Sequence, residues 1–272
     1  MKKKYQIIFL IFLTLFYSTL MHAVEWQKIG NGLEYGKFEL AVSSSSGNST
    51  VDIVRIDPAQ YDFDLLLASE HENKKRTIEN WALDFGFIGA INAGMFQTDH
   101  ITGTGYLTNY QHKNNPFRHS TYKMYFVCNP KEEGLPEAQM IDWQQPGAPE
   151  LIDKYHSVLQ CIRMIATGGK NVWSKQSAKW SEAALGQDIN GNILFIFCSS
   201  PYTMHDLINL LLQLPLDLDK MMHLEGGPEA SSYIKTEEFH LRRVGTFESG
   251  FFDNEDQVSF WQIPNIIGFR KK

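Results

Sequence analysis

The chain of 272 residues has only three cysteines, and it shows no spacing of side chains that would bind a metal ion. Cys128, Cys161 and Cys198 do not match a zinc pattern, and their odd number leaves at least one thiol outside any intramolecular disulfide. Cys128 and Cys198 lie in apolar runs, which predicts that both are buried as small hydrophobic side chains. We therefore expect no metal site and no cofactor.

Basic residues are also in deficit, because 25 Lys and Arg face 31 Asp and Glu, for a net charge of −6. Contacts to phosphate backbones need a basic surface, so this balance argues against nucleic acid as a partner. No internal repeat is present. The content of 43% hydrophobic and 13% aromatic residues is sufficient for one sizeable core.

A long membrane-spanning run is missing as well. The apolar stretch Ile7 to Leu20 includes Thr, Tyr and Ser and is short for a transmembrane helix. It follows three lysines and precedes Ala23, which is the pattern of a signal peptide over residues 1–23, although an uncleaved anchor helix is the alternative. Cleavage would remove three Lys and no acids, so the net charge would change from −6 to −9. We expect a mature chain, residues 24–272, that is secreted or periplasmic and is not inserted in the membrane.

Apolar periodicity predicts a fold rich in strands. Runs at 51–56, 63–67, 122–128 and 191–198 favour strands, and Thr77 and Thr203 are each placed to cap a helix. The stretch 130–149 is rich in Pro, Gly and acids, which indicates an excursion outside the core. Helices do not alternate strictly with strands, so a doubly wound parallel sheet is excluded. We expect an α+β single domain with a mixed, largely antiparallel sheet and flanking helices.

One stretch combines a strand end with groups that suit chemistry. The apolar run 221–224 leads into Glu225, and Gly226, Gly227, Pro228 and Glu229 follow directly. Glycine allows a close approach to the backbone, and proline suits the first turn of a helix. The pattern indicates a strand, a tight turn and a helix start, with a carboxylate at the strand end. An ordinary loop with a solvated glutamate is the alternative.

A second stretch has a similar form. The apolar run 87–90 leads to Ile91-Asn92-Ala93-Gly94-Met95-Phe96, where a polar residue and a glycine again follow a predicted strand. If both stretches are strand ends that line one site, Asn92 and Glu225 lie close together. We therefore predict that the two turns are side by side.

In order and separation, these two stretches resemble the signatures of the phosphodiester glycosidase family. The family carries Asn-Gly/Ala-Gly-Met/Phe-Phe, then a glycine-rich segment, and later Leu-Asp-Gly-Gly followed by serines. The resemblance extends from about Tyr35 to Phe269. It implies cleavage of a sugar-1-phosphodiester at the anomeric carbon, with Glu225 in the position of the family's Asp as base or nucleophile. Asn92 would then bind a sugar hydroxyl or orient Glu225.

The chain departs from the family pattern at two further places. Cys161-Ile162-Arg163 replaces a Ser-Gly-Pro segment, and Glu182 occupies the position of an arginine. Arg163 lies in an apolar run, where a buried arginine needs a partner charge. That partner is either a substrate phosphate, which would give Arg163 a catalytic role, or a carboxylate such as Glu225.

The remaining candidates are residues expected to contact substrate. They are Gly94, Phe96, Gly226, Gly227, Ser231, and Arg118 in a polar loop, with a merely solvated loop as the alternative for Arg118. The segment Thr102 to Tyr106 is either the family's glycine-rich turn or a surface hairpin.

Three classes of function fit these residues. The first is an exported enzyme acting on a glycan phosphodiester, and the second is a non-catalytic periplasmic glycan-binding protein on the same scaffold. The third is a structural envelope protein with an aromatic-rich surface.

Overall fold

The computed structural model describes residues 26–247 and 259–272. The expected signal peptide, residues 1–23, lies outside the described residues. Within them, no helix has the length and apolar character to cross a membrane.

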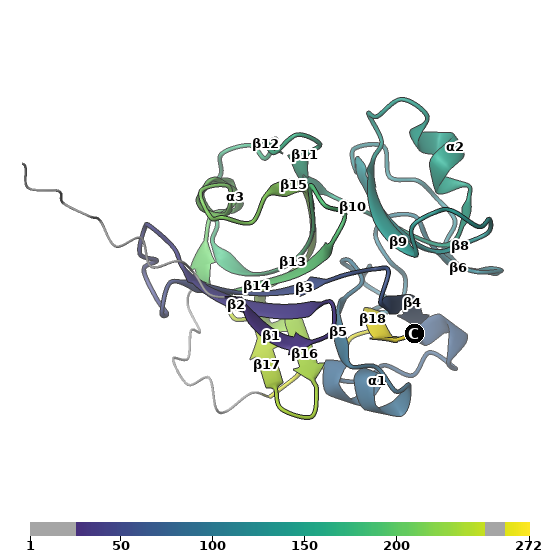
Figure 1. Ribbon diagram of the computed structural model, residues 1–272, viewed down its shortest axis with the longest axis horizontal. Coiled ribbons are helices and arrows are strands. Elements are labelled where there is room, and N and C mark those ends of the chain that lie inside the picture. The colour runs from purple at the N-terminus through teal and green to yellow at the C-terminus, as the bar shows by residue number, and fades with distance from the viewer. Residues whose placement is uncertain (1–25, 248–258) are drawn as a thin grey trace, which may run out of the picture.

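The described strands form three sheets (Figure 1). The first has the order β1-β2-β3-β14-β13-β15-β11-β12. Its strands are β1 (Gln27–Gly30), β2 (Leu33–Glu39), β3 (Thr50–Ile56), β11 (Arg163–Ala166), β12 (Lys170–Asn171), β13 (Trp180–Asp188), β14 (Ile193–Tyr202) and β15 (Leu218–Gly226).

The second and third sheets have five strands each, in the orders β7-β6-β10-β8-β9 and β17-β16-β5-β18-β4. The second contains β6 (Leu107–Asn109), β7 (His112–Asn115), β8 (Met124–Pro130), β9 (Ala138–Asp142) and β10 (Tyr155–Cys161). The third contains β4 (Tyr61–Leu67), β5 (Gly89–Asn92), β16 (Ser231–Lys235), β17 (His240–Val244) and β18 (Asn265–Lys271).

All pairs between these strands are antiparallel. The largely antiparallel pairing expected from the sequence is therefore confirmed, but the described strands form three sheets and not one mixed sheet. The alternation of residue types in the sequence nonetheless indicated strands correctly. Along β4, buried and half-buried residues alternate strictly.

Helices are few and short, so the α+β expectation holds only loosely. They are α1 (Ile78–Asp84), α2 (Ala148–Ile152) and α3 (Met204–Leu211), with 3₁₀ turns η1 (Ala68–Glu70) and η2 (Gly227–Glu229). The side chains of Thr77 and Thr203 accept hydrogen bonds from the first turns of α1 and α3, which confirms both predicted caps. In Figure 1, α3 lies beside β15 of the first sheet, and α1 lies beside the third sheet.

The largest apolar cluster draws side chains from all three sheets. Phe195 and Leu224 come from the first sheet, Phe126 from the second, and Phe63 and Phe269 from the third. Rings pack edge to face between β14 and β18 and between β4 and β8. This shared core holds the ends of β5, β10 and β15 in a fixed relation to one another.

One expectation about element placement is wrong. The stretch 130–149 contains β9, whose Met140 and Ile141 are buried, because strand pairing with β8 outweighs the turn-rich composition on either side. At the C-terminal end, β18 lies between β5 and β4. Cys128 and Cys198 are buried and free, as predicted, and so is Cys161.

Candidate functional site

The two turns singled out in the sequence lie side by side. Asn92, at the end of β5, donates from Nδ2 to the carbonyl oxygen of Glu229 at 2.9 Å. Its Oδ1 accepts from the amide of Ser231 at 2.8 Å. The predicted strand and turn are present, but the predicted helix start is only the single 3₁₀ turn η2, after which the chain continues into strand β16.

The side-chain contacts of Asn92 are with the backbone of the turn. Asn92 and Ser231 are both 2% exposed, and both polar ends of the Asn92 side chain hold the turn that follows Glu225. A buried amide that satisfies two backbone groups fixes local geometry. Asn92 therefore positions the turn that follows Glu225, and its predicted contact with a sugar hydroxyl stays a prediction.

Glu225 lies at a bulge in β15. His223 and Glu225 of β15 pair with Ala184 and Ala183 of the neighbouring strand β13. The pairing register shifts between these two pairs, because β15 has one extra residue there. A bulge changes the direction of the side chain at a strand end, and bulges are common beside active sites. Oε1 of the half-buried Glu225 accepts from the amide of Gly226 at 3.0 Å.

Burial raises the pKa of Glu225 to about 7. The charge of His223 and the Gly226 amide oppose this rise, whereas the charges of Glu229 and Glu182 add to it. A carboxyl group with a pKa near neutrality exchanges its proton in the range where acid–base catalysis is most effective.

A buried pair behind Glu225 was not foreseen. His223 Nδ1 lies 2.6 Å from Glu182 Oε1, and Trp180 Nε1 donates to Glu182 Oε2 at 3.0 Å. Burial opposes the charged form of His223, but the charge and hydrogen bond of Glu182 prevail and raise the pKa of His223. Burial raises the pKa of Glu182, against the influence of His223 and Trp180. Trp180, Glu182, His223 and Glu225 are called the Glu225 cluster below.

The glycines beside this cluster make room for protein side chains. A Cβ atom at Gly226 would overlap the ring of Trp180, and one at Gly227, where φ is +68°, would overlap the ring of Phe247. At Gly94, where φ is +78°, a Cβ would lie 2.7 Å from Cys161 Sγ. Their expected contacts with substrate remain predictions, while their packing role is direct.

Cys161 links the three strand ends. It ends β10, lies against Gly94, and has a thiol whose pKa is raised by burial and by the charge of Glu225. The amide of His223 donates to the carbonyl oxygen of Ile162 at 3.0 Å, which places β15 beside the end of β10.

Arg163 has a structural carboxylate as its partner. Its Nη1 lies 2.7 Å from Oδ1 and 2.8 Å from Oδ2 of Asp142, and it also donates to Gln144 Oε1 at 2.8 Å. The side chains of Arg163 and Asp142 are 13% and 3% exposed. The proposal that Arg163 binds a substrate phosphate is therefore not supported, because its charge is already neutralised.

Two other candidates, Arg118 and Phe96, have their recorded contacts with residues other than Glu225. Arg118 packs over the rings of Tyr106 and Trp143, with Nη2 3.6 Å from Asp153 Oδ1. Phe96 forms an isolated bridge with Gly103, so the glycine-rich segment and the Asn92 stretch do lie together.

Among residues 26–247 and 259–272, no group of three or more His, Cys, Asp or Glu side chains is arranged to hold a metal ion.

Comparison with known proteins adds the family. The model of the family described as phosphodiester glycosidase matches residues 85–270, which is more than half of the chain. No curated protein gives a significant match to the sequence.

Two solved structures have a similar fold. The catalytic domain of zebrafish N-acetylglucosamine-1-phosphodiester alpha-N-acetylglucosaminidase, auto-inhibited by its pro-peptide, has a TM-score of 0.61 at 11% identity, with 90% of this chain and 86% of that chain covered. A hypothetical protein from Synechocystis has a TM-score of 0.60 at 15% identity, with 92% and 64% covered.

Proposed function

Because the chain belongs to the phosphodiester glycosidase family, we propose that it is a hydrolase that cleaves a sugar-1-phosphodiester. The bond between the anomeric carbon and the ester oxygen breaks, and that oxygen leaves with the electron pair as part of a phosphomonoester. Water supplies the hydroxyl group of the released sugar. The fold likeness to the zebrafish enzyme is consistent with this reaction, and at 11% identity it bears on the fold alone.

The observation that carries the proposal is the state of Glu225. This carboxyl group is half-buried at a bulged strand end, has a pKa of about 7, and accepts one backbone hydrogen bond. A phosphomonoester is a weakly basic leaving group, so the step needs attack at the anomeric carbon more than protonation of the departing oxygen. We assign the ionised form of Glu225 to that attack, as nucleophile or as base toward water.

The buried pair behind Glu225 would keep that form available. His223 is held against Glu182 at 2.6 Å, and its positive charge lowers the pKa of Glu225 against the effect of burial. Without such a cation, desolvation would favour the protonated form still more strongly. His223 and Glu182 are positioning residues in this proposal and not groups that react.

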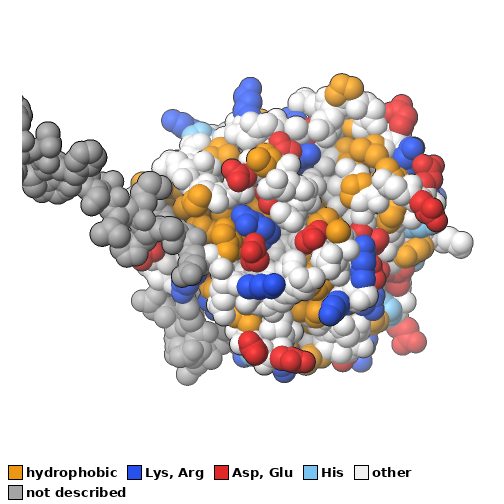
Figure 2. All heavy atoms as spheres, viewed as in Figure 1, with side chains coloured by type: hydrophobic (Ala, Val, Ile, Leu, Met, Phe, Trp, Pro, Cys, Tyr) orange, Lys and Arg blue, Asp and Glu red, His pale blue; other side chains and the backbone are white. Residues whose placement is uncertain are grey.

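The substrate is a glycan phosphodiester of the cell envelope or of the exterior, and the protein is secreted or periplasmic. The basic and apolar N-terminal region supports export. Nucleic acid is not a partner in this proposal. On the face seen in Figure 2, blue basic side chains are interspersed with red acidic ones, which differs from the broad basic surface that phosphate backbones require.

The test is hydrolysis of a panel of sugar-1-phosphodiesters, with release of free sugar and phosphomonoester as the readout. Glu225→Gln preserves the shape of the side chain and removes its charge, so turnover should fall by about 10²-fold or more, the scale of lost acid–base catalysis. Glu229→Gln is the matched control, because Glu229 lies in the next turn and should matter far less.

Three outcomes would contradict parts of this proposal. Equal loss in both variants would mean that Glu225 is not the specific carboxylate, and undiminished turnover in Glu225→Gln would remove it from the chemistry. If the wild-type chain turns over no diester but binds one, the glycan-binding alternative replaces the enzyme. Two departures from the family pattern favour the glycan-binding alternative. Glu225 replaces the family's Asp, and Glu182 replaces its arginine.

A further inference from the structure

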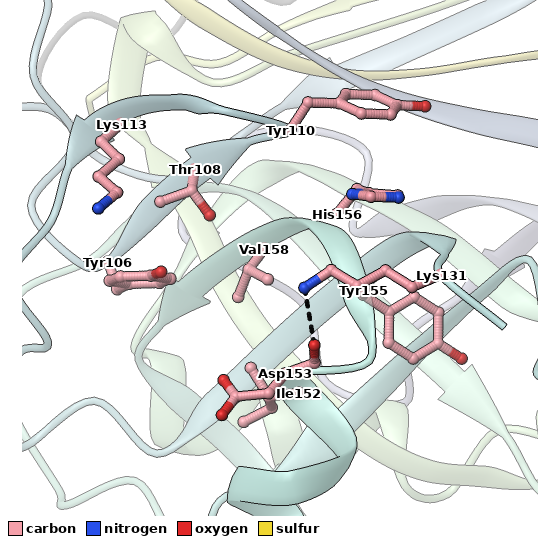
Figure 3. A pocket seen from close by; sticks show the side chains of 10 residues that line it. All are labelled: Tyr106, Thr108, Tyr110, Lys113, Lys131, Ile152, Asp153, Tyr155, His156 and Val158. Carbon is pink, nitrogen blue, oxygen red and sulfur yellow. Dashed lines mark hydrogen bonds between the residues drawn. The ribbon is translucent and has the colours of Figure 1, made fainter.

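A second site lies on the outer face of the second sheet, beside α2. It is a pocket of about 110 Å³ between the β6–β7 hairpin and the segment Ile152–His156 (Figure 3). β10 carries His156 at the pocket and Cys161 near Glu225, and these five steps span about 16 Å at the usual rise of a strand. The pocket is therefore separate from the Glu225 cluster.

The floor and one wall of the pocket suit the apolar face of a sugar ring. Val158 and Ile152 are buried at its base, and Thr108 presents a hydroxyl group on the strand next to Val158. The Tyr110 ring is stacked on His156, with centroids 4.9 Å apart and planes at 17°, although Tyr110 is 54% exposed. An exposed aromatic ring held in a fixed orientation offers a flat contact surface at a small entropic cost.

The rim carries two ammonium groups. Lys131 Nζ donates to the backbone oxygen of Asp153 at 2.8 Å, drawn as the dashed line in Figure 3, and this leaves two of its three hydrogens for a ligand. Lys113 makes no ion pair or side-chain hydrogen bond with any residue in the described part of the chain. The single acid of the rim, Asp153, lies 3.6 Å from Arg118. The rim is therefore net positive.

We propose that this pocket binds a sugar phosphate, as a site distinct from the one that contains Glu225. The pyranose ring would lie against Tyr110, its hydroxyl groups would bond to Thr108, His156 and Asp153, and the phosphate oxygens would bind Lys113 and Lys131. At about 110 Å³ the pocket is smaller than the about 300–1,000 Å³ of pockets for drug-sized ligands, which favours a small ligand. The inference does not depend on Glu225 being catalytic.

The experiment uses the Glu225→Gln chain, so that no ligand is consumed. Glucose 1-phosphate, glucose, inorganic phosphate and adenosine monophosphate are each titrated, while the backbone amide signals of Tyr110 and His156 are followed by NMR. Glucose 1-phosphate should shift these signals and bind more tightly than glucose or phosphate alone. Because the signals belong to the pocket, the result is independent of whether the proposed hydrolysis occurs.

Two variants separate the contributions to binding. Tyr110→Ala should weaken the binding of glucose 1-phosphate by about fivefold or more, since it removes the stacking surface. Lys113→Ala should weaken the binding of glucose 1-phosphate by about threefold to fivefold, the scale of one exposed ionic contact. The affinity for glucose should not change. Phe117→Ala and Lys170→Ala are the controls, because each removes an exposed side chain of the same kind that does not line the pocket.

Several results would overturn the proposal. Unchanged signals at Tyr110 and His156 would mean that the pocket binds no sugar phosphate. Inorganic phosphate binding as tightly as glucose 1-phosphate would reduce the pocket to an anion site, and tighter binding of adenosine monophosphate would assign it to nucleotides. Equal losses in Tyr110→Ala and Phe117→Ala would remove the stacking contact.

Discussion

Arg163 on β11 and Glu225 on the adjacent strand β15 are both partly buried, and they differ in whether an opposite charge is paired with them directly. Arg163, which pairs across the strands with Met222, binds Asp142 through two short contacts and Gln144 through a third. Asp142 also accepts from the amides of Gln144 and Thr167. The charge of Arg163 is therefore paired directly with a carboxylate, as in a structural ion pair, although its buried Nε has no hydrogen-bond partner in the described part of the chain.

Glu225 is different, because its hydrogen-bond partner within the described part of the chain is a single backbone amide, and two other carboxylates raise its pKa. The protein leaves this group with a pKa near neutrality, at a cost in stability whenever it is ionised. The comparison indicates that the arginine holds the first and second sheets together, and it is consistent with the chemical role proposed for the glutamate.

The largest effect should come from Arg163→Met. This change leaves Asp142 buried without its cation, so the free energy of unfolding should fall by about 3–5 kcal/mol. Urea unfolding measures the loss. Replacing both partners, as in Arg163→Met with Asp142→Leu, should recover much of it. If Arg163→Met abolished turnover and left stability unchanged, the arginine would belong to the substrate site after all.

Glu225→Gln should have the opposite effect on stability, and one that depends on pH. The folded-state pKa of Glu225 is raised to about 7 from a usual value near 4.5, so its favourable contribution is complete below the unfolded pKa and is lost as pH rises through about 7. Gln carries no such dependence. The variant should therefore match the wild type near pH 4 and exceed it by about 2–4 kcal/mol at pH 8, from the size of the shift.

Urea unfolding at several pH values between 4 and 8 measures this difference. Glu229→Gln is again the matched control, because it changes the same chemical group in the turn η2 that follows Glu225. A constant difference between Glu225→Gln and the wild type across this range would mean that Glu225 titrates as an exposed glutamate, and the comparison with Arg163 would lose its basis.

Much of the local structure could be predicted from the sequence. The alternation at 61–67 and the threonines at 77 and 203 specify a strand and two helix starts through contacts between near neighbours. The contact between Asn92 and the turn after Glu225 could also be predicted. Asn92 and Glu225 each come at the end of an apolar run, with glycine close behind. Signals of this kind depend on a few adjacent residues.

The partners of buried charges could not be predicted in the same way. Glu182 and His223 are 41 positions apart and meet because of the register of β13 with β15 and the bulge between them. Asp142 meets Arg163 because β9 forms inside a stretch whose composition predicts a loop. A signal was present nonetheless, since a glutamate and a histidine inside buried strands each need a partner.

The smallest effect should come from His223→Gln, which tests how the buried pair acts on Glu225. The charge of His223 lowers the pKa of Glu225, so its loss should raise that pKa and move the rising limb of turnover against pH upward by about one unit, the scale of one nearby charge. Turnover should then fall about tenfold at a pH below the limb and little above pH 9, because one pKa unit corresponds to a factor of ten. The glutamine amide still donates to Glu182, which limits the structural loss.

His240→Gln, on the exposed part of β17, is the control. A uniform loss at every pH would show that His223 only supports the fold, whereas a shifted limb with an unchanged plateau would show that it sets the ionisation of Glu225.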